Sequence, residues 1–398
     1  MADRSSPPAD RPPFIEALRD AERCARKGDP EVAERAFRAL LADLRLLPHV
    51  PMDAYGRARN GLGRLLASQG RPAEAIEVFE KTIGVLDALL SQSAGRDRDE
   101  LRATLELARA MVMLSGLRHR AGAPDDADAL VNRAVCDVLR RVMPAWELRN
   151  PRSETLAATL SDMAMELCAQ QRPDHAERML RLELAERERL ECPVRVSSRT
   201  RIRLAQCLMQ QGKHVEAERM FRWALEQRIK ADLPLDATTK ARCWLATCLL
   251  EMKRPEEAEQ LLLDGLSDLR ALDDQPRSRA ALRYTLARVN LEQGRQEEAK
   301  EMLTRGLEDL EGRGGDPDTA ALHRVGLAKI LHAEGQRARA EATLLQAIGE
   351  GRVTSLHPST LDMIRQHLAA FRREPSRGSL GDLAGRTTLH GLEAGGMP

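Results

Sequence analysis

Aromatic residues are scarce in this chain of 398 residues, since five Phe, three Trp and two Tyr make up only 3% of it. Strands favour aromatic and β-branched residues, so the composition does not favour a large sheet. No stretch of about 18 apolar residues occurs, which argues against a membrane-spanning helix. The seven cysteines are scattered without a CxxC pair, so a disulfide framework is not indicated. Residues 1–13 are polar and lack the apolar stretch of a signal peptide. We therefore expect a cytoplasmic protein with reduced thiols.

An excess of one charge is also lacking, because 62 basic residues face 61 acidic ones. This balance excludes a global attraction to nucleic acid or to an anionic membrane. Lys is rare, with eight residues against 54 Arg, which indicates a GC-rich, bacterial genome. Hydrophobic residues at 42% and charged residues at 31% are typical of many amphipathic helices.

A fixed pattern recurs eight times along the chain. Its turn residue is followed after five positions by Ala and four positions later by a large apolar residue. The turn residues are Gly28, Gly70, Gly122, Gln171, Gly212, Lys253, Gly294 and Gly335, and the last five are each 41 residues apart. The alanines are Ala33, Ala75, Ala127, Ala176, Ala217, Ala258, Ala299 and Ala340. The large residues are Phe37, Phe79, Val131, Leu180, Phe221, Leu262, Leu303 and Leu344.

Seven of the eight units also carry a large residue beside a small one shortly before the turn, as in Leu62–Gly63 and Leu204–Ala205. The small residue lets a neighbouring helix approach, and the large one fills the space that remains. Each unit therefore predicts a helix, a tight turn and a second helix. Gly at most turn positions can adopt φ > 0 and end the first helix. Gln171 and Lys253 lack that freedom, so their turns are expected to be strained or of another type.

The pattern L-[GA]-x2-L-x3-G-x4-A-x3-F-x2-A-L resembles the tetratricopeptide repeat, and RIRLAQCLMQQGKHVEAERMFRWAL matches it almost throughout. The 41-residue period resembles the kinesin-light-chain-like subtype. This resemblance implies an all-α, right-handed α-solenoid of about eight helical hairpins over residues 14–357. We expect a capping helix at 358–373, longer loops that project near Ser91–Glu100 and Met143–Glu154, and disordered tails at 1–13 and 374–398.

No constellation for catalysis is found, since the chain contains no HExxH, GxSxG or GxxxxGK[ST] motif. We therefore expect no enzyme activity, no cofactor and no metal site. Cys207 and Cys248 share one repeat position, which favours packing over reactivity. The pairs Glu256–Glu257 and Glu297–Glu298 follow turns, where negative charge suits the start of a helix.

The family resemblance implies that positions 2, 5, 9 and 12 of each first helix face the concave side of the array. The basic residues at these positions are Arg57, Arg64, Arg109, Arg199, Lys240, Arg288 and Lys329, whereas Glu22 is the one acid. Asn60 lies between Arg57 and Arg64. Apolar or small residues fill other inward positions: Ile202, Met209, Leu250, Tyr284, Leu291 and Val325. We predict that this face binds an acidic and hydrophobic segment of a partner protein. The alternative is that its basic residues are ordinary solvated helix positions.

Position 4 of the first helix is Arg in five units: Arg59, Arg201, Arg242, Arg283 and Arg324. We interpret these residues as structural, with the stem on apolar surface and the head on an acid or carbonyl of the preceding unit. The function predicted from the whole pattern is a scaffold or adaptor for proteins or peptides. The alternative is a regulator that senses a peptide or sequesters an enzyme in bacterial signalling or defence.

Overall fold

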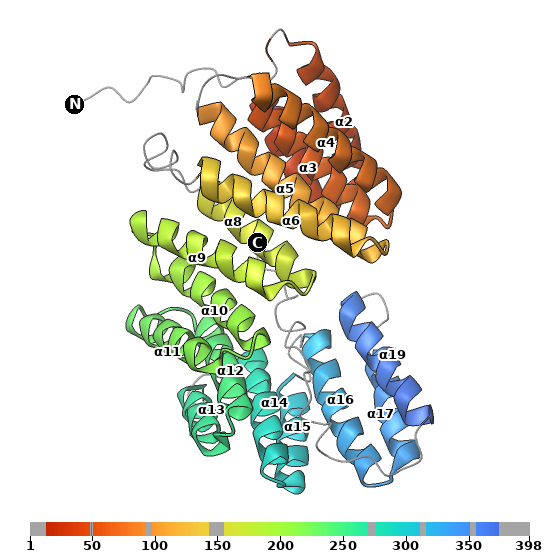
Figure 1. The fold of residues 1–398 in the computed structure, drawn as a ribbon. Coiled ribbons are helices and arrows are strands. Elements are labelled where there is room, and N and C mark those ends of the chain that lie inside the picture. The colour runs from red at the N-terminus through yellow and green to blue at the C-terminus, as the bar shows by residue number, and fades with distance from the viewer. Residues whose placement is uncertain are drawn as a thin grey trace, which may run out of the picture. The chain divides into compact units, whose positions relative to one another are not determined.

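The computed structural model describes residues 13–47, 49, 51–92, 98–142, 155–269, 275–310, 316–350 and 356–373. Every regular element in these ranges is a helix, which confirms the predicted all-α fold (Figure 1). The chain divides into two compact units, Met1–Cys192 (unit 1) and Pro193–Pro398 (unit 2). The tails expected to be disordered lie outside the described residues, apart from Pro13, which begins the first helix. Most of the two longer loops lies outside them too.

Unit 1 is a stack of helical hairpins in which each first helix also packs on the first helix of the next hairpin. The hairpins are α1 (Pro13–Lys27) with α2 (Pro30–Arg45), α3 (Met52–Ser68) with α4 (Pro72–Gln92), α5 (Arg98–Arg120) with α6 (Pro124–Asp137), and α8 (Thr155–Ala169) with α9 (Pro173–Arg189). A short π-helix, η1 (Val138–Val142), continues α6 and packs on α5. Part of the extra length of the early repeats therefore lies in longer helices, α4 and α5.

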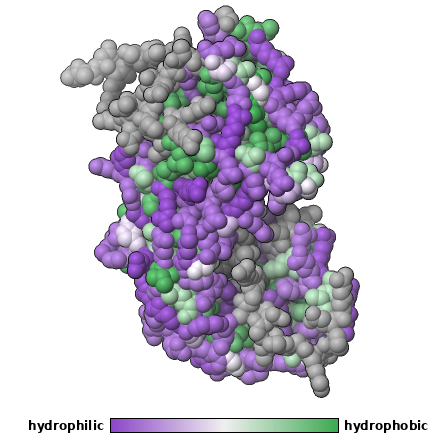
Figure 2. Space-filling view, in the orientation of Figure 1, coloured by the Kyte–Doolittle hydropathy of each residue, from purple (hydrophilic) through white to green (hydrophobic). Residues whose placement is uncertain are grey.

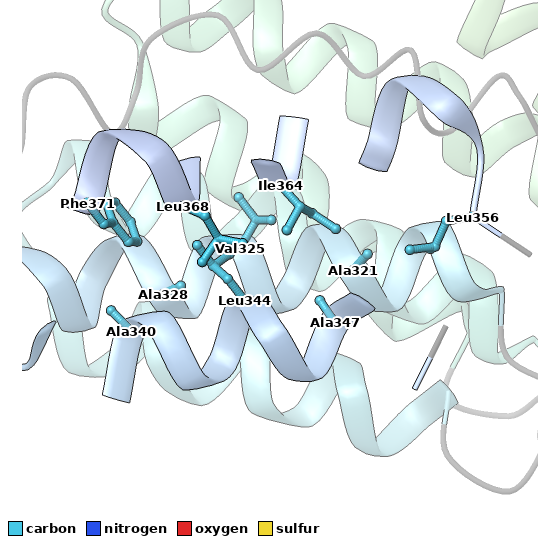
Figure 3. Close-up of a cluster of buried hydrophobic side chains, with 10 residues drawn as sticks. All are labelled: Ala321, Val325, Ala328, Ala340, Leu344, Ala347, Leu356, Ile364, Leu368 and Phe371. Carbon is cyan, nitrogen blue, oxygen red and sulfur yellow. The ribbon is translucent and has the colours of Figure 1, made fainter. Parts of the chain in front are cut away.

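Unit 2 repeats the same arrangement with a more regular period. Its hairpins are α10 (Val194–Gln210) with α11 (His214–Lys230), α12 (Leu235–Glu251) with α13 (Pro255–Leu269), α14 (Pro276–Glu292) with α15 (Gln296–Leu310), and α16 (Pro317–Ala333) with α17 (Arg337–Glu350). Helix α19 (Pro358–Arg373) covers α16 and α17, and it occupies the place of a further first helix. Figure 3 shows Ile364, Leu368 and Phe371 of α19 packed on residues of α16 and α17.

The repeated small and large residues form the core, as the pattern predicted. All eight repeated alanines are fully buried, as are Phe37, Phe79 and Phe221. Close approach explains the glycines of α3. A Cβ added at Gly63 would lie 2.6 Å from Cζ of Phe79, and one at Gly61 would lie 2.6 Å from Cζ of Phe37. The rings of two successive hairpins therefore pack directly against the backbone of α3.

In three hairpins, the Glu that follows the core Ala pairs with an Arg of the next hairpin. Arg71 pairs with Glu34 of the preceding hairpin at 2.7 Å, and Arg254 pairs with Glu218 at 2.9 Å. Arg295 makes the same contact with Glu259 at 2.7 Å. The residue after the turn thus reaches back along the stack, which gives this part of the repeat pattern a structural role.

The turns at Gln171 and Lys253 adopt the same left-handed conformation as the glycine turns. Their φ angles are 57° and 58°, compared with 75° at Gly212. The turn type is therefore conserved along the array, and a side chain is tolerated at a position where it carries a conformational cost.

Replacing Lys253 by Gly is expected to raise the free energy of unfolding of unit 2 by roughly 0.5–1 kcal/mol, because Gly adopts φ > 0 without strain. The ion pair that is lost, Lys253 with Glu292 at 3.5 Å, joins a lysine side chain that is 80% exposed, so it contributes little. Lys253→Ala is the matched control, since it removes the same side chain but keeps Cβ. Urea unfolding measures both variants, and equal stability of the two would contradict this account.

Candidate partner-binding surface

We define the first-helix face of each unit as the side formed by the predicted inward positions of its first helices. In unit 1 this face carries paired charges. Arg57 of α3 binds Glu22 of α1 through an ion pair of 2.7 Å, and both side chains are about one-third exposed. The one acid found among the inward positions is therefore already bound to a predicted site residue.

A buried polar network continues across α3, α5 and α8. Asn60 donates from Nδ2 to the carbonyl oxygen and to Oε2 of Glu106, each at 2.9 Å. Glu106 also pairs with Arg109 at 3.1 Å, and Arg109 reaches Asp162 at 2.6 Å. Burial tends to lower the pKa of Arg109, but Glu106 and Asp162 outweigh it and hold that pKa above its ordinary value. Asn60 and Arg109 thus act inside unit 1, where they join neighbouring helices.

Arg64 differs from its neighbours on this face, because it is exposed and has no ion-pair partner among the described residues. Asp162, the partner of Arg109, remains 46% exposed on α8. The first-helix face of unit 1 therefore combines acids and bases, and the basic character predicted for it is largely neutralised.

The same face of unit 2 has a different charge pattern. Arg288 of α14 donates from Nη1 to the hydroxyl of Thr247 on α12 at 3.3 Å, which is a neutral acceptor. Burial, with the positive charge of Arg288 as a second cause, lowers the pKa of Lys329 on α16. Burial and the charge of Lys329 then lower the pKa of His367 on α19 to about 4. A line of side chains thus runs over four successive first helices, and the charged neighbours that shift these pKa values are all basic.

Arg199 of α10 is exposed and Lys240 of α12 is half-buried. Arg199 also lowers the pKa of the buried Arg228, although burial of Arg228 is the larger cause and brings it to about 10. We name Arg199, Lys240, Arg288 and Lys329 the basic face of unit 2. Each of its members comes from a different first helix.

Most of the apolar inward positions are not available to a partner, contrary to the sequence-based expectation. At most 9% of each residue is exposed in this set: Ile202, Met209, Leu250, Tyr284 and Val325. They lie at positions 5 and 12, which pack between adjacent first helices. Leu291 is half-buried and is the exception in that list. Tyr284 packs at 5.5 Å from the ring of His323, and burial raises its pKa.

The arginines at position 4 are structural, but the predicted direction of their contacts was wrong. Arg242 pairs with Asp268 at 2.5 Å, and Arg283 pairs with Asp309. Both acids belong to the second helix of the same hairpin rather than to the preceding unit. Arg201 lies over the ring of Trp223 on its own second helix, 3.6 Å from the centroid. In these three hairpins, the arginine at position 4 therefore joins the first helix to the second helix of the same hairpin.

The cysteines Cys207, Cys243 and Cys248 are buried. Burial raises the pKa of the Cys243 thiol to about 11 and that of Cys248 to about 12, so neither is a reactive thiolate at neutral pH. The Glu297–Glu298 pair lies in the first turn of α15, as predicted. Among the described residues, no group of three or more His, Cys, Asp or Glu is arranged to hold a metal ion.

Hydrophilic residues cover most of the visible surface, and hydrophobic residues appear in separate patches (Figure 2). No helix in the described part of the chain is long and apolar enough to cross a membrane. These observations, together with the stacked hairpins, define an α-helical repeat scaffold.

Family comparisons agree with this class. One tetratricopeptide-repeat model matches residues 21–89 and 202–269, and a second matches residues 280–305 and 321–346. The chain is a tetratricopeptide-repeat protein, a type of repeat that forms protein-interaction scaffolds. None of the curated proteins matches it.

Solved structures share the fold at low sequence identity. The apo form of RapI is 12% identical with a TM-score of 0.50, and the match covers 90% of this chain and 97% of that one. NprR in complex with its cognate peptide NprX is 12% identical with a TM-score of 0.45, covering 98% and 91%. A putative kinesin light chain from Podosopora anserina, with nearly identical TPR-like repeats, is 17% identical with a TM-score of 0.35, covering 66% and 97%. At these identities the likeness concerns the fold alone.

Proposed function

We propose that the protein is a scaffold that binds an acidic segment of a partner protein on the basic face of unit 2. The observation that carries this proposal is the contrast between the two first-helix faces. Unit 1 pairs Arg57 and Arg109 with acids, whereas Arg288 of unit 2 donates to the hydroxyl of Thr247. A surface that presents one basic side chain from each of four successive first helices attracts carboxylates of another chain.

The accessible part of this face is basic rather than apolar, which sets the chemistry of the partner. Arg199 is exposed, and Lys240, Arg288 and Lys329 are half-buried, while the apolar positions between them are mostly buried. An extended segment lying across α10, α12, α14 and α16 therefore meets one basic side chain per hairpin. The hydrophobic half of the predicted partner finds little exposed surface here besides Leu291. We therefore propose that acidic residues of the segment provide most of its contacts with this face.

Charge reversal tests the proposal. The double variant Arg199→Glu/Lys240→Glu and the double variant Arg288→Glu/Lys329→Glu are each expected to bind the partner about tenfold more weakly or worse, since each change replaces attraction with repulsion. Tagged full-length protein is used for affinity capture from the native host, and the captured partner is then titrated by calorimetry.

The matched control is Arg178→Glu/Arg219→Glu, which makes the same change in net charge at exposed positions of the second helices α9 and α11. It is expected to bind as the unmodified protein does. Equal binding by all variants, with unchanged helix content by circular dichroism, would show that the partner is held elsewhere.

A further inference from the structure

Arg59 of α3 is an arginine of unit 1 that pairs with no acid among the described residues. It occupies position 4 of its repeat, it is 6% exposed, and its guanidinium lies over the ring of Tyr55 at 5.1 Å from the centroid. Nη1 donates to the carbonyl oxygen of Val78 on α4 at 3.5 Å, which is a long and weak hydrogen bond. Nε is enclosed without an acceptor, whereas Nη2 lacks an acceptor but is not enclosed. The guanidinium therefore keeps donor capacity that an incoming anion can use.

Other repeats place an acid where the hairpin of Arg59 has none. The position 15 residues after the turn residue is acidic in six of the eight repeats: Asp43, Asp137, Glu186, Asp268, Asp309 and Glu350. The two exceptions are Val85 and Gln227. Where position 4 is Arg and this acid is present, the two pair, as Arg242 does with Asp268 at 2.5 Å and Arg283 does with Asp309. The hairpin of α3 and α4 thus keeps the arginine but replaces its acid by Val85.

The surface of α4 that faces position 4 is aliphatic and partly open. Val78 is half-buried and Val85 is 37% exposed, and their separation of seven residues places both on one face of the helix. Glu77 is 63% exposed and pairs with Lys81. Its pKa is lowered mainly by the hydrogen bond from Lys81, with Arg59 as the smallest cause. The acids of α4 therefore leave the charge of Arg59 largely uncompensated.

We infer that Arg59 binds a carboxylate of a partner protein, namely an Asp or Glu with an aliphatic neighbour in the partner's sequence. The carboxylate takes the place of the acid that Val85 replaces, and the aliphatic neighbour packs on Val85. A charge-assisted hydrogen bond to a buried guanidinium is stronger than the bond to the carbonyl of Val78, so the exchange is favourable. The inference goes beyond the proposed function, because this site belongs to the hairpin of α3 and α4 in unit 1.

The first experiment uses the full chain and a blocked peptide, acetyl-Leu-Asp-Leu-amide, whose one charge is the Asp side chain. Acetyl-Leu-Asn-Leu-amide is the matched neutral probe. The NMR signal of the Nε–H group of Arg59, assigned by its loss in Arg59→Gln, reports on the site directly. We expect a saturable shift with the Asp peptide and binding about tenfold weaker with the Asn peptide. No shift with the Asp peptide, or equal shifts with both peptides, would overturn the assignment.

Two variants of one position locate the site. Val85→Asp restores the acid that Asp268 provides for Arg242, so it is expected to pair with Arg59 and to abolish the shift caused by the Asp peptide. Val85→Asn has nearly the same size without the charge, and it is expected to keep that shift. We also expect unit 1 of Val85→Asp to unfold about 2–4 °C above unit 1 of Val85→Asn. Equal peptide binding by the two variants would exclude this site.

The inference and the proposed function fail separately. The variants Arg199→Glu/Lys240→Glu and Arg288→Glu/Lys329→Glu are expected to keep the Arg59 shift, since they change unit 2. If they lose it, the peptide acts through the basic face and the assignment to Arg59 is wrong. If Arg59 binds the peptide but charge reversal in unit 2 does not weaken partner capture, the Arg59 site stands and the proposal for the basic face is wrong.

Discussion

Replacing Glu106 by Ala is expected to lower the free energy of unfolding of unit 1 by about 3–5 kcal/mol, because it leaves a buried arginine without its nearest counter-charge. Glu106 has a side chain that is 5% exposed, and that of its partner Arg109 is 14% exposed. Asp162 stays in contact with Arg109, but Asp162 is 46% exposed and its charge is better solvated. Calorimetric or urea unfolding of the full chain measures the loss.

A double variant separates the cost of an unpaired charge from the net contribution of the pair. Glu106→Leu/Arg109→Met removes both charges and keeps apolar volume, so it is expected to recover most of the lost stability. Glu80→Ala is the control for an ordinary surface pair, because Glu80 and Arg118 are both well exposed, and it is expected to cost less than about 1 kcal/mol. A loss in the Glu106→Ala variant no larger than in that control would contradict the buried network.

The fold was predictable from the sequence because its signals are local and repeated. Each hairpin needs a small residue where two helices approach, and Ala217 and Gly63 are found at that place. A fixed offset repeated eight times gives a signal that no single helix provides. The conformation of Lys253 was not predictable in the same way, since the surrounding hairpin imposes a left-handed turn that its residue type disfavours.

The candidate site was predicted only in part, because charge neutralisation depends on residues outside the helical-wheel positions. Glu106 lies three residues before Arg109, which occupies position 2 of its repeat on α5. Asp162 lies one residue after position 5 of its repeat on α8. Neither acid is at one of the four inward positions, yet both contact Arg109. The spacing of three residues from Glu106 to Arg109 is a recognisable helical pairing and is the signal that identifies this contact.

The contacts of the position 4 arginines had a comparable sequence signal. Asp268 follows Arg242 by the same 26 residues that separate Asp309 from Arg283. In a hairpin, that separation brings the first helix opposite the second. A periodic acid at this distance therefore indicates a partner within the repeat, whereas an acid about 36 residues earlier, as in Arg254 with Glu218, indicates a partner in the preceding one.

Acid is expected to destabilise unit 2 through His323. This side chain is fully buried between α15 and α16, with Nδ1 2.8 Å from the carbonyl oxygen of Thr319, and it fits because Gly306 has no Cβ. Burial lowers its pKa from 6.5 to about 4. His323 is therefore protonated near pH 6.5 in the unfolded chain, but only near pH 4 in the folded chain. The contribution of neutral His323 to the free energy of unfolding is fully present above pH 6.5. It decreases as the pH drops, by about 2 kcal/mol at pH 5. His367, whose pKa is also about 4, adds to the loss in the same direction.

His323→Asn tests the assignment, because the amide can replace the contact of Nδ1 with Thr319 but does not titrate. The variant is expected to be less stable than the unmodified protein at pH 7.5 and to lose less stability between pH 7 and 5, so the two curves approach each other. His49→Asn, at an exposed position of unit 1, is the control and should leave the pH dependence unchanged. Parallel curves for His323→Asn and the unmodified protein would mean that the proton is taken up elsewhere. Because carboxylates titrate mainly below this window, the slope between pH 7 and 5 reports the buried histidines rather than general acid unfolding.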